Sequence, residues 1–161
     1  MNAKDILGLF QTNHWVIKQQ MDGLTHEDSL LQLPFRGNCA NWVLGHLVVS
    51  REGILQDHMG IAGEWTEDEI ARYKYDSEPI TSADDAGLLP LERIMADIDR
   101  TQKLLEDGLV EVSDAQLAVI VDEERQRTAG YSMLFTAWHE GYHVGQLEYL
   151  RQLAGKDDKI I

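Results

Sequence analysis

The chain has 161 residues, 43% of them hydrophobic, enough for the core of one domain, which excludes an intrinsically disordered protein. Its net charge of −14 argues against nucleic acids and anionic membranes as partners, because both are polyanions. The single cysteine, Cys39, excludes an intrachain disulfide. The sequence has no membrane-spanning apolar run and no signal-peptide pattern at its N-terminus, so we expect a cytoplasmic protein.

The first half of the chain predicts two long amphipathic helices. The first is expected from about Ala3 to Leu24, with apolar residues at heptad spacing and His14 in the same row. Thr25 then resembles the cap of a short helix. The second long helix is expected from about residue 40 to residue 59. A long connection over residues 60–85 follows, and such connections usually carry a function or cover a groove.

The second half predicts two further long helices. The third is expected from about residue 88 to 108, and the fourth from about 131 to 154, where Gly155 is a good stop signal. Residues 119–122 between them favour an extended segment. Four helices of about 20 residues each predict an all-α fold, an antiparallel four-helix bundle that forms one domain over residues 1–161.

Histidines recur at positions that face the inside of this bundle. His139 and His143 are four residues apart, so they share one helix face about 6 Å apart along the axis. If helix directions alternate, the second and fourth helices are parallel, and His46 and His14 fall at the same level as this pair. Three imidazoles around an open position are typical of a metal site, so we predict a metal at His46, His139 and His143. His14 is a candidate for a substrate contact or for a group that orients a metal ligand from behind.

The same segment allows a second interpretation. Residues His139 to His143 fit the H-E-x-x-H pattern of zinc proteases, in which Glu140 acts as the general base. Those enzymes need a third ligand after the motif, and Glu148 lies off the face of the histidine pair. This absence opposes the protease interpretation, but a metal-dependent hydrolase with Glu140 as base stays an alternative. A third interpretation is a non-enzymatic bundle that binds a small molecule and has the histidines in a polar core.

Several residues near the histidines also carry expectations. We expect Trp42 and Trp138 to pack in the core. Arg51 and Arg151 could recognise a substrate carboxylate, but we expect them to be ordinary arginines at the surface. Gln146 follows His143 by three residues, almost one helical turn, and is placed to orient a ligand.

Two segments resemble the DinB-like family of four-helix-bundle proteins. The run from His139 to Arg151 resembles the family's H-x-x-x-H-x-G-Q motif, which a hydrophobic helix and an arginine follow. Asn41 to Leu47 is similar to the family's second-helix segment, where a Gly-His pair supplies a ligand. The resemblance covers nearly the whole chain and implies that His46, His139 and His143 are metal ligands, usually for zinc or nickel.

The resemblance also implies a class of reaction. Some relatives are S-transferases that use bacillithiol or mycothiol, which implies a metal-dependent transferase with a low-molecular-weight thiol as cofactor and a small molecule as substrate. A metal-bound thiol ionises more easily and becomes a better nucleophile. Exposed faces on long helices further lead us to expect a homodimer.

Overall fold

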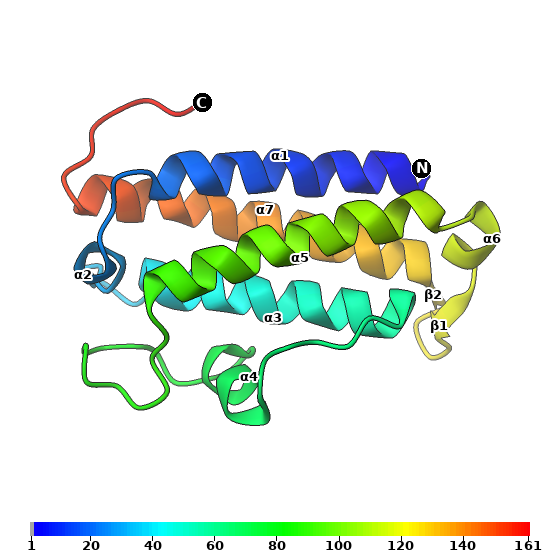
Figure 1. Ribbon diagram of the computed structural model, residues 1–161, viewed down its shortest axis with the longest axis horizontal. Helices are drawn as coiled ribbons and strands as arrows, with labels where there is room; N and C mark the ends of the chain where they lie inside the picture. The colour runs from blue at the N-terminus through cyan, green and yellow to red at the C-terminus, as the bar shows by residue number, and fades with distance from the viewer. Residues whose placement is uncertain (1) are drawn as a thin grey trace.

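The computed structural model describes residues 2–161 and contains a bundle of four long helices (Figure 1). These are α1 (Ala3–Met21), α3 (Ala40–Met59), α5 (Leu91–Glu111) and α7 (Ala129–Leu153). Both α1 and α3 pack against α5 and against α7. The predicted all-α bundle is confirmed, and each long helix lies within three residues of its expected bounds at both ends.

The directions of the helices differ from the expected alternation. Asn41, at the start of α3, donates a hydrogen bond to the carbonyl of Leu89, which comes just before α5. Further along, Arg100 of α5 pairs with Glu52 of α3, so α3 and α5 run parallel. Figure 1 shows that α1 and α7 run together in the opposite direction. The prediction that α3 and α7 are parallel is therefore wrong, because the chain returns along the bundle between α3 and α5.

The returning connection contains a helix that the sequence analysis treated as irregular. This helix, α4 (Glu67–Tyr73), lies against α3 (Figure 1). Thr66 caps it and forms a capping box with Glu69, since each side chain bonds the backbone N–H of the other residue. The connection thus covers one side of α3, as its length suggested.

The shorter elements lie near the ends of the bundle. Thr25 caps the four-residue helix α2, as expected, and Ser113 caps α6 in the same way. The extended segment expected near residues 119–122 is the first strand of a small antiparallel hairpin that precedes α7. These elements are α2 (His26–Ser29), α6 (Asp114–Leu117), β1 (Ile120–Asp122) and β2 (Arg127–Thr128).

The core consists of two hydrophobic clusters with a polar layer between them. Arg51 of α3 is fully buried in this layer, where Nε and Nη2 donate to the two carboxylate oxygens of Glu140 in α7 at 2.6 and 2.8 Å. Its Nη1 donates to the carbonyl of Ile98 in α5 at 2.9 Å. The expected surface position of Arg51 is wrong. Among the described helices, none is both long and apolar enough to span a bilayer.

Candidate metal centre

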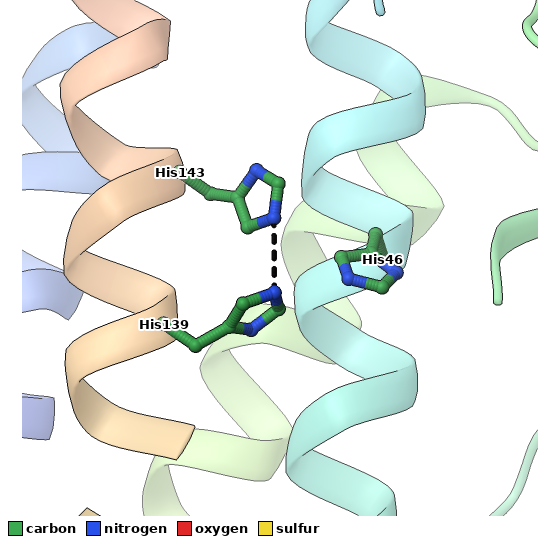
Figure 2. Close-up of side chains that lie close together, drawn as sticks. All are labelled: His46, His139 and His143. Atoms are coloured by element: carbon green, nitrogen blue, oxygen red, sulfur yellow. Dashed lines mark hydrogen bonds between the residues drawn. The ribbon is translucent and has the colours of Figure 1, made fainter. Parts of the chain in front are cut away.

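The three predicted ligands meet in the groove between α3 and α7 (Figure 2). His46 projects from α3, and His139 and His143 project from successive turns of α7. One ring nitrogen from each residue lies within 4.8 Å of the other two. The closest pair is Nε2 of His139 and Nε2 of His143, which are 3.1 Å apart. The structure therefore brings together the side chains that the sequence analysis selected, from helices that run antiparallel.

Hydrogen bonds fix which nitrogen of two rings is free. Nδ1 of His46 lies 2.9 Å from the carbonyl oxygen of Tyr73, which only accepts, so Nδ1 donates. Nδ1 of His143 donates in the same way to Oε1 of Gln146 at 2.8 Å. In each neutral ring this leaves a lone pair on Nε2, the form in which histidine binds a metal. Gln146 was expected to orient a ligand, and its side chain contacts the candidate metal ligand His143.

Tyr73 is held in place by the residues around His46. A Cβ atom on Gly45 would collide with the Tyr73 ring, so only glycine at this position allows the ring to lie against α3. The Tyr73 hydroxyl donates to Oδ1 of Asn41 and accepts from the backbone N–H of Leu89. Burial raises the pKa of Tyr73 to about 12, so the hydroxyl stays protonated. The carbonyl that orients His46 is therefore fixed by its own side chain.

The three rings are neutral at physiological pH. Burial lowers the pKa of His46, of His139 and of His143, because it disfavours the charged form. For His143, burial and the neighbouring histidines lower the pKa to about 4, although the Gln146 oxygen opposes the shift. A metal therefore meets little competition from protons at these nitrogens.

His14 does not join the cluster. Its Nε2 lies 2.8 Å from Oδ1 of Asp99 on α5, and Lys18 binds the other oxygen of that carboxylate. The preceding residue, Asn13, does face α7, where its side-chain amide donates to the carbonyl of Ala137 at 2.9 Å. Successive residues of an α-helix point about 100° apart. His14 therefore lies at the expected level along the bundle but faces α5 and not α7.

Glu140 lies between the two α7 histidines in sequence but faces the core. Its side chain is 1% exposed, and both carboxylate oxygens are bound to Arg51. A general base must reach the water or substrate whose proton it takes. This geometry gives Glu140 a structural role and does not support the hydrolase alternative.

A groove along α3 and α7 leads to the histidines. It has a volume of about 370 Å³, and His46 and His139 form part of its wall. The rest of its wall on α3 and α7 is mixed: Ile54 and Phe135 are apolar, and the polar or small residues are Ser50, Gly53, Asp57, Ser132 and Thr136. The site is therefore accessible to a polar small molecule.

The two tryptophans near the site have different environments. Trp42 is buried as predicted, and its ring stacks on His46 with the centroids 4.8 Å apart. Trp138 is 60% exposed on α7, so the prediction that it packs in the core is wrong. Arg151 is also buried, where it binds the carbonyls of Gln20 and Asp22 and the carboxylate of Asp158, so its predicted surface position is wrong as well.

Comparisons with known proteins identify the family and the fold of the chain. The model of the DinB superfamily matches residues 18–147, a span that includes all three histidines. The chain belongs to the DinB superfamily. The crystal structure of a conserved protein from Enterococcus faecalis has the same fold, with a TM-score of 0.73 over 97% of this chain and 99% of that chain, at 13% sequence identity. No curated protein matches the sequence. The superfamily is metal-associated, and the structure contains a histidine cluster that could hold a metal ion.

Proposed function

We propose that this DinB superfamily protein is a metal-dependent enzyme whose divalent cation, zinc or nickel, is held by His46, His139 and His143. The observation that carries the proposal is the convergence of the three ring nitrogens within 4.8 Å. The Nδ1 bonds of His46 and His143 support it, because they leave Nε2 free toward the shared centre. Imidazole ligands suit both metals.

We further propose that the enzyme uses a low-molecular-weight thiol of the bacillithiol or mycothiol type and joins it through its sulfur to an electrophilic small-molecule substrate. The S–H bond breaks, a C–S bond forms, and the proton leaves to solvent or with the group that the thiol displaces. A bound cation would supply the positive charge that stabilises a thiolate. The hydroxyls of Ser50, Ser132 and Thr136 offer hydrogen bonds to a polar ligand in the groove. The stacked ring of Trp42 shields His46 from water.

The charge and the cofactor also bear on partner and location. A net charge of −14 favours a small-molecule substrate over a nucleic acid. We propose that the protein works in the cytoplasm, because a free thiol cofactor stays reduced there.

Absorption spectroscopy tests the thiol proposal. Tag-free protein is loaded with Co²⁺, and a glucosamine-linked thiol is added in millimolar excess. We expect a new sulfur-to-metal charge-transfer band in the wild type and in His14→Ala, whose histidine lies outside the site. The band is expected to be absent in His46→Ala. If metal-loaded wild-type protein shows no spectral change with the thiol, the thiol-dependent function is wrong.

A further inference from the structure

The helix that carries two of the histidines has a second pattern, on its outer face. Starting at Tyr131, exposed residues recur along α7 at intervals of four, three, four, three and four residues, which is the heptad spacing of helices that pack side by side. We call these residues the aromatic strip: Tyr131, Phe135, Trp138, Tyr142, Gly145 and Tyr149. The side chains of its five aromatic members are 44–68% exposed.

The strip lies opposite the face of α7 that builds the core. At about 100° per residue, its members fall within one narrow sector. The buried residues Met133, Ala137 and Val144 fall about half a turn away. Between Ala129 and Leu147, every α7 residue with an exposed side chain or backbone belongs to the strip. The strip is therefore the whole outer surface of this part of the helix.

The strip is large enough to form the centre of an interface. Five aromatic side chains that are about half exposed present roughly 500 Å² of ring surface. Stable protein interfaces bury about 800 Å² on each partner, so the strip could supply the centre of one, and the largest apolar patch on a monomer, typically about 300–600 Å², is often functional. Val121 of the hairpin is also exposed and lines a pocket together with Tyr131.

The charge of the chain indicates which partner fits. The molecule carries a net charge of −14, yet along the strip from Tyr131 to Tyr149 the carboxylates are Glu140, which is buried, and Glu148, which is exposed beside Tyr149 at the end of the strip. Two copies of so acidic a chain repel each other over most of their surface, so a face with few carboxylates is where their approach costs least. A heptad pattern of this kind also complements itself. A second copy of this chain therefore fits the strip.

We propose that two copies of this chain pair through their aromatic strips about a two-fold axis, and that each copy narrows the entrance to the metal site of the other. Phe135 stacks on His139 with the ring centroids 6.4 Å apart, and Tyr142 meets His143 edge-on at 5.3 Å. In heptad packing, a residue that directly follows a residue at the centre of the interface lies at the edge of that interface. His139 directly follows Trp138, so it is expected at this edge. A partner helix on the strip thus borders the groove that leads to the site.

The oligomeric mass in solution tests the pairing. Light scattering after size exclusion is measured for the wild type, for Trp138→Glu and for a matched control, Trp15→Glu. Trp15 is 52% exposed on α1 and lies outside the strip. We expect the wild type and Trp15→Glu at twice the chain mass of 18.3 kDa, and Trp138→Glu at the single mass. Tyr149→Glu, at a strip residue that is 68% exposed, should give the single mass as well.

Two results would overturn the pairing: a wild type that stays monomeric at about 100 µM, or folded strip variants that remain dimeric. Circular dichroism checks that each variant is folded. The narrowed entrance is tested by the rate at which EDTA removes zinc, which should rise several-fold in Trp138→Glu and stay unchanged in Trp15→Glu. Equal rates would contradict the contact at the entrance. The mass measurement does not depend on metal binding or on the thiol.

Discussion

The orientation of His46 depends on its neighbour in the sequence. Gly45 leaves space for the ring of Tyr73, and the carbonyl of Tyr73 accepts the Nδ1–H of His46. The glycine therefore acts on the candidate ligand indirectly, through a residue of another helix. This explains physically why a glycine stands directly before the histidine.

Replacement of Gly45 by alanine should disturb both stability and the site. The added methyl group would push Tyr73 away from α3, and overpacking of this kind costs about 1–3 kcal/mol. We expect a lower unfolding free energy in urea and weaker zinc binding. Gly8→Ala is the control, because it has free space in α1 and should gain about 0.5–1 kcal/mol. Wild-type stability and zinc affinity in Gly45→Ala would contradict this role.

Gln146→Leu should weaken metal binding without unfolding the protein. The leucine removes the acceptor that orients His143, and the loss of such a contact typically costs about 10- to 100-fold in metal affinity. Competition with a chromophoric chelator measures the change. Gln152→Leu, an exposed position on the same helix, should bind zinc as the wild type does. Equal affinities for the two variants would show that the contact is unimportant.

At the residue scale, the meeting of His139 and His143 was predictable because spacing along a helix fixes the face. His46 lies beside them as expected, although its level was predicted from parallel helices that in fact run antiparallel. Their role as metal ligands stays a prediction. The sequence predicted His14 poorly, since the level of a residue along the bundle does not say which neighbour it faces. The contact from Tyr73 was beyond prediction, because a backbone carbonyl leaves no side-chain signal. The burial of Glu140 did have a signal in the sequence, because this charged residue lies in the same helical row as Met133 and Val144.

At the scale of elements, the connection that contains α4 is tied to two long helices. Trp65 donates its indole N–H to Oδ2 of Asp97 on α5 at 2.8 Å. Glu52 of α3 accepts the backbone N–H groups of Glu64 and Trp65. The capping box at Thr66 could be predicted from the sequence. These hydrogen bonds could not, because they join residues far apart in the chain.

Asp97 should make stability depend on pH. Burial alone would raise its pKa, but hydrogen bonds from Trp65, Arg93 and Arg100 outweigh it and leave the pKa lowered. With a folded pKa below the unfolded value of about 3.9, its stabilising effect is complete at neutral pH and is lost as the pH falls. Asp97→Asn should therefore cost about 1–3 kcal/mol at pH 7 and less at about pH 3.

Urea unfolding at both pH values measures this difference, with exposed Asp68→Asn as the control. A cost for Asp97→Asn that is the same at both pH values would rule out the ionised carboxylate as its source.

At the scale of the whole molecule, the buried pair of Arg51 and Glu140 joins α3, α5 and α7 between the two apolar clusters. The sequence placed both residues on long helices, but it did not identify them as partners. Which residues meet depends on the directions of the helices. The returning connection makes α5 parallel to α3, and α7 then runs antiparallel to both. The bundle was therefore predictable, whereas its topology and its central ion pair were not.

Removal of one partner of this pair should be far more harmful than removal of both. Arg51→Met leaves the Glu140 carboxylate buried without its counter-charge, which typically costs about 3–5 kcal/mol. The double variant Arg51→Met, Glu140→Met should recover most of that loss, because two apolar side chains of similar size fill the space. Denaturant unfolding of both single variants and the double variant measures the coupling. If the double variant loses as much unfolding free energy as the two single variants together, the coupling between Arg51 and Glu140 is contradicted.

The most direct test of the central claim is the metal content of tag-free protein. Wild type, His46→Ala and His14→Ala are incubated with zinc or nickel, dialysed, and analysed by mass spectrometry of the elements. If the three histidines form the site, the wild type and His14→Ala retain about one divalent ion per chain, and His46→Ala retains at least tenfold less. A wild type that retains almost no metal, or a His46→Ala variant that retains as much as the wild type, would contradict it.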